Sequence, residues 1–103
     1  MFRLDELQIK VVQWAYDRNI IDGMTAKDQL PKLMEEAGEL AGALVKNRRD
    51  VVLDSIGDLA VVLIIMAEQE SVSLTQCLNL AWDEIKDRRG KVQNGVFVKE
   101  EDL

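Results

Sequence analysis

The chain has 103 residues, of which 48% are hydrophobic, and its 13 basic and 19 acidic residues give a net charge of −6. This length fits a single domain over residues 1–103, and the acidic balance argues against nucleic-acid binding, which needs a basic face. The chain has no histidine and a single cysteine, Cys77. An imidazole base, a typical zinc site and an internal disulfide are therefore excluded.

The apolar segments are too short for a membrane protein. The longest apolar run, residues 59–67, has nine residues, whereas a spanning helix needs about 20. Residues 1–10 mix polar and apolar side chains, unlike a signal peptide, and one cysteine fits a reducing compartment. We therefore expect a cytoplasmic protein with no membrane partner.

The periodicity of apolar residues predicts four helices. They are expected at residues 4–19, 29–46 and 51–70, and from Ser71 or Ser73 to Gly90, a residue type that commonly ends helices. The short polar connection between the second and third helices makes them antiparallel neighbours. Asn94-Gly95 predicts a turn, followed by a short extended segment at residues 96–98. The expected fold is all-α and four-helix bundle-like, completed by oligomerisation.

A pattern of acidic residues and a glycine occurs twice, nineteen residues apart. Glu35 and Glu39 in the first copy, and Asp54 and Asp58 in the second, are each separated by about one helical turn. If the two helices pack antiparallel, these side chains and Glu36 can converge, and five carboxylates repel one another unless a cation binds them. Ligand sets made only of oxygen favour hard ions, so we expect Mg²⁺, with Mn²⁺ as a substitute.

An ion-pair network is the alternative to a metal. Residues 59–67 are apolar on every side, which predicts a buried central helix. Asp54 and Asp58 would then lie at the edge of a buried region, where an uncompensated charge is costly. Lys46 and its neighbours Arg48 and Arg49 could supply the compensating charge without a metal.

Gly38 and Gly57 occupy equivalent places in the two copies of the pattern. A glycine inside a helix costs about 1 kcal/mol relative to alanine. The pair therefore predicts either a close approach of the two backbones around shared ions or ordinary tight packing.

Basic residues late in the chain predict a site for an anionic substrate. Lys86 and Arg89 are three residues apart on the expected fourth helix, and Lys91 follows its expected end. Arginine binds phosphate with two parallel hydrogen bonds and lysine binds it as a point charge, although cations at a helix C-terminus also stabilise the helix without any function. Trp14 could stack on a nucleobase, but we expect Trp14 and Trp82 to belong mainly to the core.

The motif formed by Glu35, Glu36 and Glu39, followed by Asp58 at the start of an apolar helix, resembles the all-α nucleoside triphosphate pyrophosphohydrolases. The likeness is greatest to the MazG and MazG-like branch, with its small single-domain members in phages and bacteria. It extends over nearly the whole chain.

The chain departs from this family in the second motif, Glu-x-x-Asp. Asp58 matches the aspartate, but Ser55 stands where the family has glutamate. Asp54 is the nearby carboxylate that could replace it, displaced by about 100° around the helix.

The resemblance implies magnesium-dependent hydrolysis of a normal or damaged nucleoside triphosphate between its α and β phosphates, which releases a monophosphate and pyrophosphate. The three glutamates and Asp58 would hold one or two ions, Glu35 or Glu36 would accept a proton from water, and Lys86 and Arg89 would contact the phosphates. The resemblance also implies a homodimer or homotetramer.

Two alternatives remain open from the sequence. One is an enzyme of the same fold that acts on phosphoribosyl-ATP or an alarmone-type nucleotide. The other is a non-catalytic helical protein that binds a metal or a nucleotide, and Ser55 is the residue that supports it.

Overall fold

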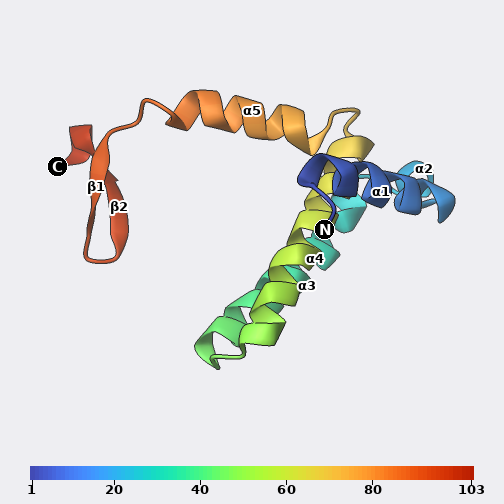
Figure 1. Cartoon of the computed structure of the whole chain (residues 1–103), viewed down its shortest axis with the longest axis horizontal. Helices are drawn as coiled ribbons and strands as arrows, with labels where there is room; N and C mark the ends of the chain where they lie inside the picture. Colours follow the sequence, from blue (N-terminus) through green and yellow to red (C-terminus); the bar gives the residue numbers. More distant parts are fainter.

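The chain forms a hook in the computed structural model, which describes residues 1–103 (Figure 1). Its elements are α1 (Leu4–Asp17), α2 (Ile20–Gly23), the 3₁₀ helix η1 (Lys27–Gln29), α3 (Leu30–Val45), α4 (Arg49–Gln69), α5 (Leu74–Ile85), β1 (Gly90–Gln93), β2 (Val96–Lys99) and the 3₁₀ helix η2 (Glu100–Asp102). The all-α class is confirmed, since the two short strands form the only sheet. None of the helices has both the length and the apolar character needed to cross a membrane.

Helices α3 and α4 form the antiparallel hairpin expected from the short connection between them (Figure 1). Asn47 reverses the chain with a left-handed φ of 55°, and the amide of Arg48 donates to the carbonyl of Ala43 at 2.9 Å. The small buried side chains of Ala43 and Ser55 lie on these two helices. Small residues let the helix axes approach, which positions the acidic residues of both helices.

A small apolar core joins α1 and α2 to α4. Ala15, Ile21 and Ile65 are buried and form one cluster. The hydroxyl of Tyr16 donates to Glu68 at 2.9 Å, which fixes α1 against α4. We call residues 4–69, from α1 to α4, the body.

Helix α4 is less completely covered than its apolar sequence predicts. Val62, Ile64, Ile65 and Ala67 are buried, but Leu63 is 42% exposed. Both expectations for the two glycines, close approach of the backbones and ordinary tight packing, are also wrong, because a Cβ added at Gly38 or Gly57 would meet open space. One side of this helix has no partner within the chain.

Residues 74–103 extend away from the body, to which residues 70–73 join them, and we call residues 74–103 the arm (Figure 1). Ser73 caps α5: its hydroxyl accepts from the amide of Gln76 at 3.1 Å, and the Gln76 side chain accepts from the Ser73 amide at 2.8 Å. The helix ends at Ile85, so the expectation that it runs to Gly90 is wrong. Gly90 instead starts β1, where the backbone of Val98 occupies the space that a Cβ would need.

The expected turn at Asn94-Gly95 and the extended segment after it are confirmed, and together with β1, which the sequence did not predict, they form a β-hairpin. Gln93 pairs with Val96, and the two turn residues, Asn94 and Gly95, have φ values of 52° and 79°. Both angles are in the left-handed region that this two-residue turn requires, which explains the Asn-Gly pair.

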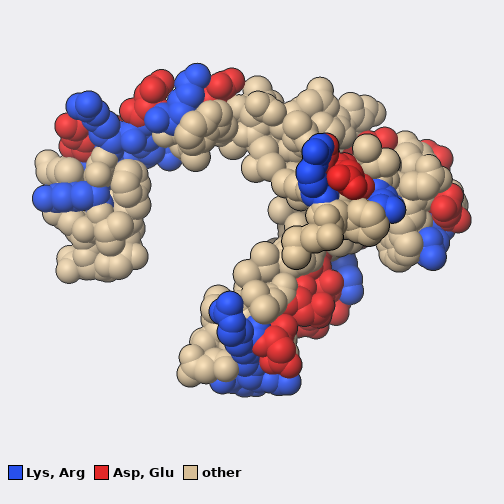
Figure 2. Space-filling view, in the orientation of Figure 1, with Lys and Arg blue, Asp and Glu red and all other residues tan.

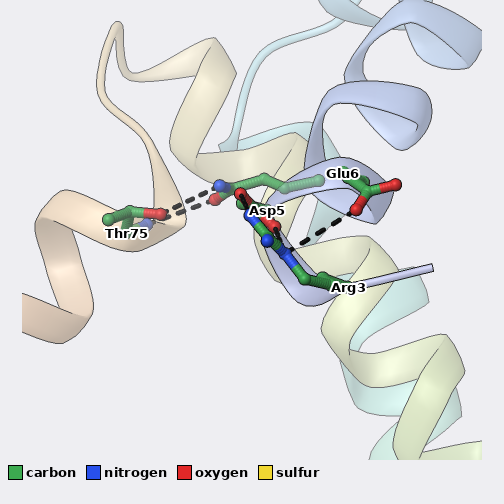
Figure 3. Close-up of polar contacts among 5 residues, drawn as sticks. Arg3, Asp5, Glu6 and Thr75 are labelled. Carbon is green, nitrogen blue, oxygen red and sulfur yellow. Dashed lines mark hydrogen bonds and ion pairs between the residues drawn. The ribbon is translucent and has the colours of Figure 1, made fainter.

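The arm is joined to the body by few polar contacts. The Gln8 side chain donates to the Thr75 hydroxyl at 2.9 Å and accepts from the Thr75 amide at 3.2 Å. Next to this contact, Arg3 pairs with Asp5 at 2.8 Å at the start of α1 (Figure 3).

Candidate active site

Three carboxylates of α3 form a group where this helix lies against α4, and two aspartates of α4 adjoin it. Glu35, Glu36 and Glu39 of α3 each place a carboxylate oxygen within 4.8 Å of the others. Desolvation raises the pKa of Asp58 on α4, and the adjacent carboxylates of Asp54 and Glu36 raise it further. The structure thus groups three of the five expected acidic residues, and Asp58 lies next to both Glu36 and Asp54; we call these five residues the carboxylate cluster.

Glu36 is the buried member of the cluster. Its side chain is only 5% exposed, and Oε1 lies 3.1 Å from Nζ of Lys32. The other oxygen, Oε2, is buried and has no hydrogen-bond partner. A buried carboxylate oxygen without a partner is costly, so this atom needs a cation or a donor that the chain does not supply.

The chain compensates little of the cluster's negative charge. Lys32 is the one basic residue paired with the cluster, at 3.1 Å from Glu36 and 3.8 Å from Glu35. The ion-pair network expected as the alternative to a metal does not form, because none of its three residues, Lys46, Arg48 and Arg49, pairs with the cluster. The nearby charge of Glu36 raises the pKa of Glu39, with desolvation as the next cause. A set of carboxylate oxygens with excess negative charge and one unpartnered oxygen fits Mg²⁺ or Mn²⁺.

An apolar groove of about 430 Å³ leads from one side of the cluster. Glu35 and Lys32 lie at one end, and Trp14, Gln29 and Val61 are among the other lining residues. Trp14 is 45% exposed, and the Arg18 guanidinium lies 4.5 Å from the centroid of its ring. The expectation that Trp14 belongs to the core is therefore wrong, and it is equally wrong for the exposed Trp82 of α5.

Gln29 is a candidate site residue that the sequence did not identify. It is buried although it is polar, and it lines the apolar groove. Its Nε2 faces only the sulfur of Met24, at 3.6 Å, which is a weak acceptor. The signal that could have found it is a polar residue directly before the apolar face of α3.

A second groove, of about 550 Å³, runs from the cluster toward the tip of the α3–α4 hairpin. Glu35 and Glu39 lie at its acidic end, and Lys46 and Arg48 lie at its basic end. Gly42 lines it as well, and a Cβ there would meet open space. Figure 2 shows the acidic side chains along the hairpin and the basic side chains at its tip. Lys46 follows Glu39 by two helical turns, a spacing that could have indicated a shared face.

Residues 4–89 match the phosphoribosyl-ATP pyrophosphohydrolase family. The chain belongs to this family. It is part of the all-α pyrophosphohydrolase superfamily that also includes the MazG-like proteins. The resemblance is confirmed at that level, but the match does not name the MazG branch.

The chain is also similar to an uncharacterized 18.2 kDa protein from the rep-hol intergenic region of Haemophilus phage HP1. The two sequences are 46% identical over 72 residues, which is 70% of this chain. The match covers 44% of the phage protein, so the chain spans less than half the length of this relative. No solved structure matches the chain significantly.

The departure from the second motif of the pyrophosphohydrolases has a structural explanation. Ser55 is only 1% exposed, so a longer side chain there would have to displace its neighbours. Asp54 lies beside Asp58, whose pKa it raises. Asp54 is thus placed to contribute the carboxylate that Ser55 cannot.

The basic residues expected to bind phosphate do not meet the cluster within one chain. Because α5 ends at Ile85, Lys86 and Arg89 do not share a helix face. Lys86 pairs with Asp83 at 3.3 Å, and Arg89 and Lys91 line a depression beside β2. Figures 1 and 2 show this part of the arm far from the α3–α4 hairpin.

Proposed function

We propose that the protein hydrolyses nucleoside triphosphates, with ribose or deoxyribose, between the α and β phosphates to give a monophosphate and pyrophosphate. The unpartnered, buried Oε2 of Glu36 within the carboxylate cluster is the observation that carries this proposal. The match of residues 4–89 to a family of nucleotide pyrophosphohydrolases supports the reaction type. The assignment to a MazG-like subgroup is part of the same proposal.

Mg²⁺ is the proposed cofactor, with Mn²⁺ as a substitute, and the carboxylate cluster would hold it. Bound there, the ion would supply charge neutralisation for the phosphates and lower the pKa of a water molecule. Glu36 is buried and paired with Lys32, whereas the Glu35 side chain is 57% exposed and borders both grooves. We assign to Glu35 the acceptance of the proton from the attacking water.

The two grooves suggest how a nucleotide would lie. Lys46 and Arg48, at the basic end of one groove, would bind the leaving pyrophosphate, whose negative charge grows as the bond breaks. The apolar groove would receive the nucleoside, with Trp14 against the base and the Gln29 amide toward its polar edge.

Phosphoribosyl-ATP is a second candidate substrate, because the matching family bears its name. The non-catalytic alternative has weaker support, since Asp54 lies beside Asp58 and leaves the cluster with five carboxylates.

One experiment tests the proposal and separates the candidates. Pyrophosphate release is measured with ribo- and deoxynucleoside triphosphates and with phosphoribosyl-ATP, each with Mg²⁺, with Mn²⁺ and with a chelator. We expect metal-dependent release of equal amounts of monophosphate and pyrophosphate from the triphosphates. Release from phosphoribosyl-ATP alone would replace the first candidate with the second. No release from any substrate, by protein that binds Mn²⁺ in a calorimeter, would overturn the enzymatic function.

A further inference from the structure

One ion pair of α3 joins an exposed lysine to a buried carboxylate. Nζ of Lys32 lies 3.1 Å from Oε1 of Glu36, and the Lys32 side chain is 53% exposed whereas that of Glu36 is only 5% exposed. In the other ion pairs of the chain, both side chains are at least 32% exposed. Ion pairs on the surface contribute little to stability, but the pair with Glu36 compensates a charge that is held away from water.

Lys32 is poorly placed to stabilise the helix that carries it. It lies in the first turn of α3, which contains no acidic residue, and the helix dipole disfavours a cation at this end. It also precedes Glu36 by four residues, which is the less favourable order for a lysine and a glutamate at this spacing. The position of Lys32 is therefore explained by its contact with Glu36 and not by helix stability.

The pairing with Lys32 leaves Glu36 with a single free oxygen. Its Oε2 is buried and has no hydrogen-bond partner, while the lysine holds Oε1. Glu36 also adjoins Glu39 on its own helix and Asp58 on α4. Lys32 thus determines which oxygen of the buried carboxylate remains available to a cation at the carboxylate cluster.

We propose that Lys32 is a positioning residue that makes the carboxylate cluster selective for Mg²⁺ over Ca²⁺, an inference that rests on the metal site of the proposed function. Mg²⁺ requires a compact octahedron, whereas Ca²⁺ takes about six to eight oxygens in a flexible arrangement and accepts both oxygens of one carboxylate. By holding Oε1, Lys32 limits Glu36 to one metal ligand. Partners of this kind orient a ligand without touching the metal themselves.

The orientation of Glu36 is distinguishable from a simple effect of charge. A lysine near the cluster repels Mg²⁺ and Ca²⁺ to a similar degree, because both ions carry two charges. Loss of the contact that orients Glu36 acts on the two ions differently, since only Ca²⁺ gains from a second oxygen of the same carboxylate. Lys46 is the matched control: it lines a groove with Glu35 and Glu39 but pairs with neither. The ratio of the two metal affinities therefore isolates the orientation.

Competition for bound Mn²⁺ measures this ratio without any substrate. Free Mn²⁺ is followed by electron paramagnetic resonance while Mg²⁺ or Ca²⁺ is added, which gives the ratio of the Ca²⁺ to the Mg²⁺ dissociation constant. Lys32→Met should lower the ratio roughly tenfold, whereas Lys46→Met should change both constants by the same factor and leave the ratio unchanged. An unchanged ratio in Lys32→Met would overturn the proposal, even if both ions bind more tightly, because Lys32 would then act only through its charge.

Lys32→Gln tests the hydrogen bond to Glu36. It removes the same charge as Lys32→Met but keeps an N–H donor at the same four-residue spacing, so it should recover part of the wild-type ratio. A ratio as low as that of Lys32→Met, in variants with wild-type helical content by circular dichroism, would contradict the positioning role. Wild-type protein that binds no Mn²⁺ would overturn both the metal site and this inference. Wild-type protein that binds Mn²⁺ and shows the expected ratios, but releases no pyrophosphate, would contradict the proposed reaction and leave the role of Lys32 standing.

Discussion

The body and the arm differ in how completely they fold within one chain. All eleven buried residues lie between Ala15 and Ala67, in the body. The arm also has apolar residues, including Leu78, Trp82 and Phe97, but all three are exposed. The body therefore holds the carboxylate cluster on its own. The arm has apolar residues suited to packing, but within one chain no surface covers them. Changes in the body should alter metal binding and chemistry, and changes in the arm should alter assembly.

The largest expected effect comes from Glu36→Gln. The substitution keeps the shape of the side chain and removes the negative charge of the carboxylate, whose Oε2 has no partner in the chain. We expect kcat/KM to fall roughly a hundredfold or more and calorimetric Mn²⁺ affinity to decrease, with helical content unchanged by circular dichroism. Glu84→Gln, on the exposed surface of α5, is the matched control and should retain activity. Full activity of Glu36→Gln would remove Glu36 from the site.

Ser55→Glu restores the glutamate of the family's second motif but places it in a buried position. In chelator we expect the free energy of unfolding to fall by about 1–3 kcal/mol, because the larger side chain must displace its neighbours. Mn²⁺ should recover part of this loss, since the new carboxylate can act as a ligand. Ser55→Gln has a similar size and no charge, so it should be destabilised without this recovery. Equal recovery in both variants would show that residue 55 does not reach the metal.

Trp14→Ala and Trp82→Ala compare the two regions directly, because both rings are exposed. Loss of a base-stacking ring costs about 1–3 kcal/mol, so Trp14→Ala should raise KM roughly tenfold with little change in Tm. Trp82→Ala should leave KM unchanged, because Trp82 lines neither groove of the candidate site. An unchanged KM in Trp14→Ala would exclude stacking in the apolar groove.

The sequence predicts the body much better than the arm, for physical reasons. The short connection between α3 and α4 allows only an antiparallel pair, so the convergence of Glu36 and Asp58 follows from helical spacing. The Asn94-Gly95 turn is similarly local, because it requires a left-handed backbone. The places of Gln29 and Lys46 beside the two grooves do not follow from helical spacing alone, since they depend on which helix faces meet. The predicted end of α5 was wrong because glycine, which commonly follows helices, here permits close strand pairing at Gly90.

The position of the arm could not be predicted from periodicity alone. An apolar stripe indicates that a helix packs against something, but it does not distinguish the same chain from a second copy. Trp82 illustrates this ambiguity: its place in the sequence suits a core, yet it is exposed in one chain. The core expected for it would exist only in an assembly such as the homodimer or homotetramer that the resemblance implies.

The smallest expected effect is a dependence of stability on pH that arises in the body. The pKa values of Asp58 and Glu39 are raised above their ordinary 3.8 and 4.5, so the folded chain binds protons more readily than the unfolded chain. In chelator, Tm should therefore rise slightly as the pH falls from 7 to 5. The lowered pKa values of Asp5 and Asp28 act in the opposite direction, but their stabilisation is lost only below about pH 4, outside this interval.

Mn²⁺ should reverse that dependence, because protons and the metal compete for the same carboxylates. With Mn²⁺ present, Tm should be highest at pH 7 and decrease toward pH 5. Asp58→Asn should reduce both slopes, whereas Asp83→Asn, an exposed change on α5 of the arm, should leave them unchanged. Equal slopes with and without Mn²⁺ would contradict metal binding at the carboxylate cluster. Slopes that respond to Asp83→Asn and not to Asp58→Asn would locate the titrating groups in the arm.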